Sequence, residues 1–531
     1  MAFIEVTDLS YKLPGGRRLF DNVSFRAADG HHVALVGANG TGKTTLLRLL
    51  AGEEKTQGGV VRIDGRVGYM SQFIGMLGQQ LTVRDLLVSL SPDAIQTAAE
   101  RLNAWESASR ESSSEDVHLR YADALAAWGE IGGYEAEVLW DTCTSAALGA
   151  RLDEVAERSV HSLSGGEQKR LAIELLLRSD TQVLLLDEPD NFLDIPAKTW
   201  LEQALNACRK TILFVSHDRA LLAACATRVV TLEGTGAWTH PGSYSTYHLA
   251  RDERLERIDE EQRRYDEEHK RLTAVIKEFK RRAIQNDKFA TKASSVEKRL
   301  ERFERTMAPP ERPRDQNVRM SLRGGRTGKI ALRTKQLGFP GVVSPFDCEL
   351  LFGERIGVVG PNGSGKSHFL KLLAGQDIEH HGEWTLGARV TASLFSQTHD
   401  RPELSAVELV DIMAGNGLQL GEAMAGLKRY GLQEVARHPF SLLSGGQQAR
   451  FQILLLELAG PTMLLLDEPT DNLDVDSAEA LERGLDGYEG TVVAVTHDRW
   501  FMQLMDRFLV FDSDGTVEER LDSPYLITQP A

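Results

Sequence analysis

The sequence contains few of the features that mark exported or membrane-spanning proteins. Among its 531 residues it has four cysteines, and no two of them form a C-x-x-C pair: Cys143, Cys208, Cys225 and Cys348. This scatter argues against a disulfide framework or a zinc site and favours buried free thiols. No apolar run approaches the roughly 20 residues that a membrane-spanning helix needs. The start, MAFIEVTDLSYKLPGG, lacks a basic stretch followed by an apolar core, so we expect a cytoplasmic protein.

Acidic residues outnumber basic ones, 77 to 61. The net charge of −16 argues against a general affinity for nucleic acid, although a local basic segment could still provide it. The composition, 42% hydrophobic and 26% charged, is typical of a globular protein. A chain of this length is too long for one hydrophobic core, so we expect two or three domains.

An internal repeat of large period is the most informative feature of the chain. Five motifs occur twice in the same order: GANGTGKT and GPNGSGKS, YMSQ and LFSQ, LSGGEQ and LSGGQQ, LLLDEPDNFLD and LLLDEPTDNLD, VSHDR and VTHDR. The copies lie 323 residues apart at Gly37 and Gly360, but 280 apart from Ser164 and Ser444 onward. The first copy therefore holds additional residues between its YMSQ and LSGG motifs.

Those additional residues fall at about 93–137. AIQTAAERLNAW and YADALAAW have apolar positions at helical spacing, and the polar SRESSSED separates them. This pattern predicts a helical hairpin, which we call the arm.

A charged segment, 244–328, joins the two copies. RDERLERIDEEQRRYDEEHKRLTAVIKEFKRR has no glycine or proline, which predicts one long exposed helix, and SSVEKRLERFER predicts a shorter one. Residues 251–270 carry 6 basic and 9 acidic side chains, whereas residues 271–329 carry 17 basic and 7 acidic ones. A run of charge is often only a solvated helical face. Basic charge gathered near the predicted tip favours contact with a phosphate backbone, the candidates being Lys280, Arg281, Arg282, Lys288, Lys292, Lys298 and Arg299.

Each copy carries a G-x-x-x-x-G-K-[S/T] motif directly after an apolar strand. Such a loop surrounds phosphate oxygens with backbone N–H groups at the start of a helix. Lys43 and Lys366 are expected to hold the β and γ phosphates, and Thr44 and Ser367 to offer a hydroxyl to Mg²⁺. The remaining candidate residues of the two loops are Gly37, Asn39, Gly40, Gly42, Thr45, Gly360, Asn362, Gly363 and Gly365.

Two carboxylates end the apolar strand LLLDEP in each copy. Asp187 and Asp467 suit the Mg²⁺ shell, and Glu188 and Glu468 suit a general base or a group that orients water. The LSGG motifs precede a predicted helix and would expose N–H groups at a second anion-binding end, at Ser164, Gly165, Gly166, Ser444, Gly445 and Gly446.

These motifs, in this order and twice, resemble the ATP-binding cassette superfamily. The resemblance implies an α/β fold: two ABC-type P-loop nucleotide-binding domains, each with a helical subdomain, joined by an α-helical hairpin linker. The expected boundaries are 1–243 for the first cassette, 244–328 for the linker and 329–531 for the second cassette.

The resemblance also implies that each ATP lies between the phosphate loop of one cassette and the LSGG of the other. One site would join Lys43, Gln72, Asp187, Glu188 and His217 to Ser444, Gly445 and Gly446. Its partner would join Lys366, Gln397, Asp467, Glu468 and His497 to Ser164, Gly165 and Gly166. His217 and His497 would be the switches that sense the γ-phosphate. Tyr11 and Phe339 either stack on adenine or simply pack at a strand end.

The arm and the linker distinguish between three uses of such cassettes. The motor of a membrane transporter needs membrane domains or a partner that has them, and a DNA-maintenance ATPase has a long coiled coil or a zinc hook. Tandem cassettes with an arm, a basic helical linker and the pattern YSTY at 244–247 resemble the ABC-F family. That resemblance implies an ATPase, working as a monomer, that binds the ribosome near the tRNA exit site, with its linker directed to ribosomal RNA and peptidyl-tRNA.

Members of that family are general translation factors or antibiotic-resistance proteins, and the short linker tip around RRAIQNDKFATKASS tilts the expectation toward a translation factor. The first copy departs from the DEPTNHLD of the family at Asp190 and Phe192. The additional acid at Asp190 is a candidate source of asymmetry between the two ATP sites, through weaker nucleotide affinity or slower hydrolysis at the first; the alternative is that the substitution is neutral.

Overall fold

A computed structural model describes residues 2–72, 81–111, 114–284, 288–307, 318–396 and 402–525. By internal contacts the chain divides into a unit of residues 1–239 with 316–531, which holds both cassettes, and a helical unit of residues 240–315. No helix in the described part of the chain is long and apolar enough to cross a membrane.

Parallel strands form the centre of the first cassette. Its larger sheet has the order β5-β6-β7-β3-β8-β9, and a smaller antiparallel sheet has the order β2-β1-β4. β6 (VLLLD) and β7 (TILFV) are buried along their whole length, as expected of strands that are covered on both faces. The strands are β1 (Phe3–Lys12), β2 (Arg18–Ala27), β3 (His32–Gly37), β4 (Gly58–Asp64), β5 (Val67–Met70), β6 (Val183–Asp187), β7 (Thr211–Val215), β8 (Arg228–Glu233) and β9 (Gly236–His240).

The second cassette repeats this sheet strand for strand. Its larger sheet has the order β15-β16-β17-β13-β18-β19, which matches the order of the first cassette position by position. In its smaller sheet, β10 pairs with β11, β12 and β14. The strands are β10 (Ile330–Phe339), β11 (Val343–Phe346), β12 (Glu349–Leu351), β13 (Arg355–Val359), β14 (His381–Leu386), β15 (Ala392–Phe395), β16 (Met463–Asp467), β17 (Thr491–Val495), β18 (Arg507–Phe511) and β19 (Val517–Arg520).

Helices pack around both sheets, and their starts place the repeated motifs. The helices of the first cassette are α1 (Lys43–Ala51), α2 (Val83–Ser89), α3 (Asp93–Glu111), α4 (Glu115–Glu130), α5 (Gly133–Leu148), α6 (Leu152–Val155), α7 (Gly165–Arg178), α8 (Ile195–Ala207) and α9 (Arg219–Cys225), with a 3₁₀ turn at Val160–Ser162. Those of the second are α12 (Lys366–Leu373), α13 (Leu409–Gly415), α14 (Leu420–Arg429), α15 (Gly445–Ala459) and α16 (Val475–Asp486), with 3₁₀ turns at Gln433–Val435, Phe440–Leu442 and Phe501–Leu504. The predicted fold class is confirmed.

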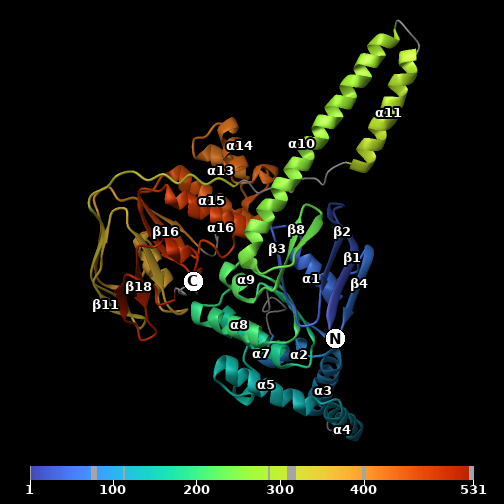
Figure 1. The fold of residues 1–531 in the computed structure, drawn as a ribbon. Helices are drawn as coiled ribbons and strands as arrows, with labels where there is room; N and C mark the ends of the chain where they lie inside the picture. Colours follow the sequence, from blue (N-terminus) through green and yellow to red (C-terminus); the bar gives the residue numbers. More distant parts are fainter. Residues whose placement is uncertain are drawn as a thin grey trace. The chain divides into compact units, whose positions relative to one another are not determined.

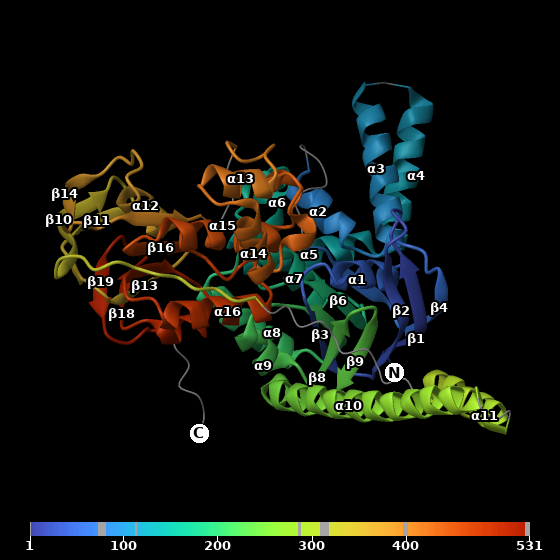
Figure 2. The ribbon, with the colours of Figure 1, turned by 90° about the horizontal axis from the view of Figure 1, so that it is seen from above.

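α3 and α4 occupy most of the predicted arm and pack against each other as a hairpin (Figure 2). Trp128 near the end of α4 lies 6.1 Å, between ring centroids, from Trp140 of α5, and both side chains are almost fully buried. The Trp140 indole N–H donates to the Ser91 hydroxyl at 3.2 Å. These contacts fix the base of the arm to the helical part of the first cassette.

The helical unit is a pair of antiparallel helices, α10 (Tyr244–Ala283) and α11 (Lys288–Met307) (Figure 1). α10 has 40 residues, so it is about 60 Å long. α11 begins six residues earlier than the SSVEKRLERFER segment from which a helix is predicted, at the lysine of KFATKA. Tyr265 and Phe303 stack across the pair, with ring centroids 4.9 Å apart. The buried aliphatic residues of the pair are Ile258, Leu272, Ile276 and Ala293, so aromatic and aliphatic side chains together hold the polar helices against each other.

Candidate nucleotide-binding sites

Each phosphate loop has the backbone that its glycines predict. The loop follows β3 or β13 and ends in a left-handed glycine, Gly42 (φ 96°) or Gly365 (φ 93°), immediately before the helix. A Cβ at Gly42 would lie 2.6 Å from Leu19, and one at Gly365 would lie 2.7 Å from Val343, so no larger residue fits. The loop can then turn tightly and present its N–H groups to an anion.

The two loop lysines are buried and bonded to their own loops. Lys43 Nζ donates to the carbonyls of Gly37 at 2.8 Å and Ala38 at 3.3 Å. Lys366 Nζ donates to those of Gly360 at 2.8 Å and Pro361 at 2.6 Å. Burial lowers the pKa of both ammonium groups. A polyphosphate placed in the loop would stabilise the charged form, because it supplies the compensating negative charge.

The strand-end aspartates lie beside the helix hydroxyls. Ser367 Oγ donates to Asp467 Oδ1 at 3.2 Å. Burial raises the pKa of Asp187, and the Thr44 hydroxyl lies near enough to oppose this rise, yet the Asp187 carboxylate makes no hydrogen bond of ordinary geometry with any described residue. A buried carboxylate with open lone pairs beside a hydroxyl fits a Mg²⁺ that arrives with the phosphates. Among the described residues, no group of three or more His, Cys, Asp or Glu could hold a metal alone.

The two glutamates that follow are held in a rarely used backbone conformation. Glu188 has φ 50° and Glu468 has φ 48°, values that non-glycine residues seldom adopt. Each N–H donates at 3.0 Å to the strand that carries the switch region, at Val215 O or Val495 O. Such strain is found chiefly at functional sites, where the surrounding structure enforces it. Burial raises the pKa of both carboxyls, as suits a group that must accept a proton.

The switch histidines lie next to these glutamates. His497 Nε2 is 3.3 Å from Glu468 Oε1, and its backbone N–H donates to Glu468 Oε2 at 2.9 Å. In the first cassette the corresponding ring-to-carboxylate distance, His217 to Glu188, is 4.0 Å. Burial lowers the pKa of His217 to about 3 and that of His497 well below its usual range, so both rings are neutral. Neutral imidazoles remain available for hydrogen bonds to a phosphate.

The glutamine of YMSQ also reaches its glutamate. Gln72 Nε2 donates to Glu188 Oε2 at 2.6 Å, and the Asn191 amide donates to the same oxygen. Gln72 therefore lies beside Glu188, another residue of the predicted Lys43 site. Gln397, its predicted counterpart, lies outside the described residues.

Both LSGG motifs begin a helix with a capping box. Ser164 accepts from the N–H of Glu167 at 3.2 Å, and Ser444 accepts from that of Gln447 at 3.4 Å. The S-x-x-E/Q pattern that explains this cap is already visible in LSGGEQ and LSGGQQ. The glycines at the first two helical positions place no side chain of their own over the helix start. The N–H groups of such a start can bind an anion.

A single cavity joins the second phosphate loop to the first LSGG. Its volume is about 360 Å³, and residues of both cassettes line it. The lining includes every described member of the predicted Lys366 site, namely Ser164, Gly165, Gly166, Lys366, Ser367, Asp467, Glu468 and His497, together with Asn362, Gly363 and Gly365 of the loop. Asn362 Nδ2 donates across the boundary to Phe192 O at 3.1 Å. The head-to-tail arrangement implied by the motifs is present here.

The Lys43 loop meets the second cassette in the corresponding way. The Asn39 N–H donates to Asp474 Oδ2 at 2.9 Å, and Asn39 Nδ2 donates to Asn472 O at 3.3 Å. A Cβ at Gly446 would lie 2.2 Å from Asn39 Nδ2, so the LSGG glycine permits this approach. Gly445 adjoins Asn472 in the same contact. Asp474 also caps α16 by accepting from Ser477 N at 3.0 Å, so one carboxylate joins the helix to the opposite loop.

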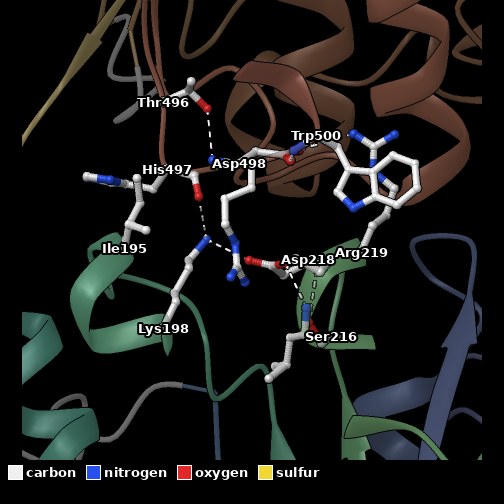
Figure 3. A network of polar contacts seen from close by, with 12 residues as sticks. Ile195, Lys198, Ser216, Asp218, Arg219, Thr496, His497, Asp498 and Trp500 are labelled. Carbon is white, nitrogen blue, oxygen red and sulfur yellow. Dashed lines mark hydrogen bonds and ion pairs between the residues drawn. The ribbon is translucent and has the colours of Figure 1, made fainter. Parts of the chain in front are cut away.

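Two related ion pairs join the cassettes beside these sites. Arg219 forms an ion pair with Glu482, and Arg499 forms one with Glu202. Both arginines follow the H-D of a switch motif, and both pairs repeat at the 280-residue offset. Figure 3 shows the surrounding network, in which Lys198 and Ile195 of α8 lie beside the segment that runs from Thr496 to Trp500. Ile195 belongs to the buried apolar cluster of the second cassette, so the boundary has apolar as well as charged contacts.

The two aromatic residues considered for adenine stacking, Phe339 and Tyr11, differ in their surroundings. Phe339 is only 2% exposed and packs in the apolar core with its ring 6.1 Å from that of His368, so the structure favours packing over adenine stacking there. The hydroxyl of half-buried Tyr11 donates to Glu54 at 2.6 Å, while its ring packs against the core. His368, which the motif analysis did not single out, does line the cavity.

A family model described as ABC transporter matches residues 20–191 and 343–471, and a second model with the same description matches residues 230–320. A protein of Mycobacteroides abscessus named "Antibiotic resistance protein" is 48% identical, over 99% of this chain and 100% of that protein. "ABC transporter F family member 5" of Arabidopsis thaliana is 30% identical, over 96% and 74%. The chain belongs to the ABC-F family. ABC-F proteins are ATPases, and the predicted ATP-hydrolysing activity of this one is confirmed by its ATP-binding domains and relatives.

Two more distant proteins complete the comparison of this ABC-F chain. "Energy-dependent translational throttle protein EttA" of Escherichia coli O6:H1 is 28% identical, over 95% of the chain and 91% of that protein. A solved structure titled "Model of ribosome-bound archaeal Pelota and ABCE1" covers 96% of the chain and 78% of its own, with a TM-score of 0.57 and 20% identity. The latter supports the fold of the paired cassettes.

The Arg499–Glu202 pair yields a prediction about cassette pairing. Arg499→Met leaves the Glu202 carboxylate buried without its cation, which costs about 3–5 kcal/mol. We expect the variant to need more ATP for half-maximal ATPase rate, because ATP must then drive closure against this cost. The double variant Glu202→Leu with Arg499→Met should recover most of the loss, since neither charge is left unpaired.

Arg333→Met is the matched control for that ATP titration. Its ion pair with Glu349 lies within one cassette, and both side chains are nearly half exposed, so it should contribute little. Equal ATP requirements in the Arg499 and Arg333 variants would contradict a role for the Arg499–Glu202 pair in joining the cassettes.

Proposed function

We propose that this protein is a cytoplasmic ABC-F ATPase that binds the ribosome near the tRNA exit site when ATP holds its cassettes together, and that it protects the ribosome against antibiotics. The observation that carries the proposal is the cavity at Lys366, which is lined from both cassettes. Because neither cassette lines this cavity alone, nucleotide there reports on cassette pairing. Binding and release of a target can then follow ATP binding and hydrolysis.

The residues of each site would have separate roles in ATP hydrolysis. The loop N–H groups and Lys43 or Lys366 would hold the phosphates, and the LSGG helix of the other cassette would contact their far end. Thr44 with Asp187, and Ser367 with Asp467, would hold a Mg²⁺ that neutralises phosphate charge. Glu188 and Glu468 would orient the attacking water and accept its proton, with His217 and His497 beside them. Enclosure between two cassettes would exclude bulk water.

The helical unit suits an RNA surface. Beyond residue 270 the linker sequence has an excess of basic residues, which rewards contact with phosphates. Four of the seven basic candidates take part in ion pairs within the unit, Lys280 with Glu297, Arg281 and Arg282 with Glu278, and Arg299 with Glu268. Such exposed pairs are weak, so phosphates can displace them. Lys288 begins α11, but its side chain is not among those described.

The relatives favour protection against antibiotics over general translation. The similarity to the M. abscessus antibiotic resistance protein extends over the whole chain at 48% identity, whereas the similarity to the translational throttle protein is 28%. A general translation factor remains the second candidate, because α10 and α11 are separated by only four residues and the tip is therefore short. This short tip is the feature on which the sequence-based tilt toward a translation factor rested.

Glu188→Gln with Glu468→Gln should trap the ATP-bound protein on ribosomes. The change removes the proton acceptor of each site but keeps its shape, so hydrolysis should slow by about 100-fold or more while ATP binding persists. Co-sedimentation with ribosomes in the presence of ATP measures the trapped complex. Absence of the protein from the ribosome pellet, with ATP binding demonstrated separately, would exclude the proposed target.

The linker can be tested in the same trapped variant. Lys292→Glu with Lys298→Glu should weaken co-sedimentation, most clearly at low salt, because like charges then face the phosphates. Arg263→Glu with Arg264→Glu is the control with the same change of charge, in the acidic half of α10. If both pairs of changes weaken co-sedimentation equally, net charge rather than the linker tip is responsible.

Drug susceptibility separates the two candidate functions. Expression in a sensitive host should raise the minimal inhibitory concentration of at least one class of ribosome-targeting antibiotic, and Lys43→Ala with Lys366→Ala should abolish the increase. If no ribosome-targeting drug is affected while the trapped variant still inhibits translation, the translation-factor function is the correct one.

A further inference from the structure

Two neighbouring substitutions break the internal repeat at the cassette boundary. Asp190 stands where the second copy has Thr470, and Lys198 stands where it has Ala478. Both pairs obey the 280-residue offset that relates the copies from Ser164 and Ser444 onward. At these two positions the first cassette has an acid and a base where the second has neither.

Lys198 lies in α8 and is only 8% exposed. Its Nζ is 3.0 Å from Asp218 Oδ2 of its own cassette and donates to the main-chain carbonyl of His497, in the other cassette, at 3.4 Å (Figure 3). His497 in turn donates its backbone N–H to Glu468 at 2.9 Å. A short chain of hydrogen bonds thus runs from Lys198 through the switch residue to the glutamate of the Lys366 site.

Asp190 is one of the carboxylates that stabilise the charge of Lys198. Its side chain is 4% exposed and lines the same cavity as Lys198. Burial and the neighbouring Asp218 raise the pKa of Asp190 to about 6, and Lys198 opposes that rise. Burial acts against the charge of Lys198, but Asp218, Asp190 and Asp471 together hold its pKa above the usual value. The ammonium group therefore stays charged inside the boundary.

The Lys366 site has a buried cation that comes from the opposite cassette. Its cavity contains Lys198 of that cassette as well as its own loop lysine. At the matching place in the second cassette stands Ala478, so the Lys43 site receives no lysine from this position; it has a buried lysine of its own cassette instead, Lys169, which donates to the main-chain carbonyl of Glu188. Asp190 follows the carboxylates of the first site in sequence, but it lines the cavity of the second site, and with His217 it also lines a smaller cavity beside the first.

We propose that Lys198 is a positioning residue of the Lys366 site, supplied by the first cassette, and that the Asp190–Lys198 pair makes hydrolysis at the two ATP sites unequal. Lys198 fixes the main chain of His497 and so the orientation of Glu468. This inference rests on the proposed assignment of ATP to the Lys366 cavity. From the sequence, an effect of Asp190 is attributed to the first ATP site. The proposal attributes the effect to the second site instead.

A purely structural pair would behave differently. The ion pair of Lys198 is with Asp218, which a double replacement of Asp190 and Lys198 leaves in place, so the stability of each variant is measured alongside its rates. The second cassette has Thr and Ala at these two places. A structural role predicts that such a replacement leaves the relative rates of the two sites unchanged. A positioning role predicts a loss at one site only.

The test measures single-turnover hydrolysis of radiolabelled ATP at each site in the full-length protein. Glu188→Gln leaves hydrolysis to the Lys366 site, and Glu468→Gln leaves it to the Lys43 site. Asp190→Thr with Lys198→Ala, which installs the residues of the second cassette, is added to each background. We expect the rate constant at the Lys366 site to fall about tenfold, and a much smaller change at the Lys43 site, with ATP affinity retained at both.

Lys198→Arg in the Glu188→Gln background is the conservative variant. It keeps a buried cation and a donor for the His497 carbonyl, so it should retain most of the rate. Three results would each overturn the inference. They are equal losses of hydrolysis rate at both sites, no loss at the Lys366 site, and a loss with Lys198→Arg as large as that with the double change. If the unmodified Glu188→Gln protein neither binds nor hydrolyses ATP at the Lys366 site, the proposed site itself has failed.

Discussion

The pairing of each phosphate loop with the other cassette is the contact on which the rest of the structure depends. Asn39 reaches Asp474 and Asn472, and Asn362 reaches Phe192, so each loop touches the segment that follows the opposite carboxylates. The Asn39 contact needs the loop asparagine itself, the helix-capping Asp474 and the LSGG glycine Gly446. The duplication of the chain follows from it, because a single copy cannot supply both sides. Covalent linkage keeps the partner at high effective concentration.

Buried charges lie at the boundary between the two cassettes, so pairing of the cassettes would depend on whether a polyphosphate is bound there. The loop lysines and the active-site glutamates are buried, and burial opposes the charged form of each. A polyphosphate would bring the negative charge that the lysines lack and would join the two cassettes through the LSGG helix starts. The two arginine–glutamate pairs lie beside the sites and join the same two cassettes. In the proposed function, nucleotide binding and closure would be linked through these buried charges.

Motifs with a fixed local geometry were predictable from the sequence. The LSGG capping boxes, the phosphate loops and the order of the repeat determine local backbone, and the structure has them at the expected residues. The single long helix α10 follows from the absence of helix breakers in its sequence. Phe339 could not be decided in this way, because an aromatic at a strand end has the same sequence pattern whether it faces a ligand or the core. The ion pairs between the two linker helices, Lys280–Glu297 and Arg299–Glu268, also depend on which helix faces meet, which composition does not reveal.

Lys198 shows a different limit of sequence reasoning. It belongs to none of the motifs, and only its distance from the opposite switch residue gives it a function to test. Comparing the two copies would have identified it, since Lys198 and Ala478 are aligned by the same offset as the DEP carboxylates. The comparison of the two copies does not show where Lys198 lies in the fold. In the structure, its buried ammonium group lies in the cavity of the other cassette's ATP site.

The account depends above all on ATP being shared between the cassettes. The most direct measurement is an experimental structure of the Glu188→Gln, Glu468→Gln protein with ATP and Mg²⁺. We expect two nucleotides, each with its phosphates between the lysine of one loop, Lys43 or Lys366, and the Ser-Gly-Gly helix start of the other cassette. Nucleotides bound to separated cassettes, with Ser164 and Ser444 both remote from phosphate, would contradict the account.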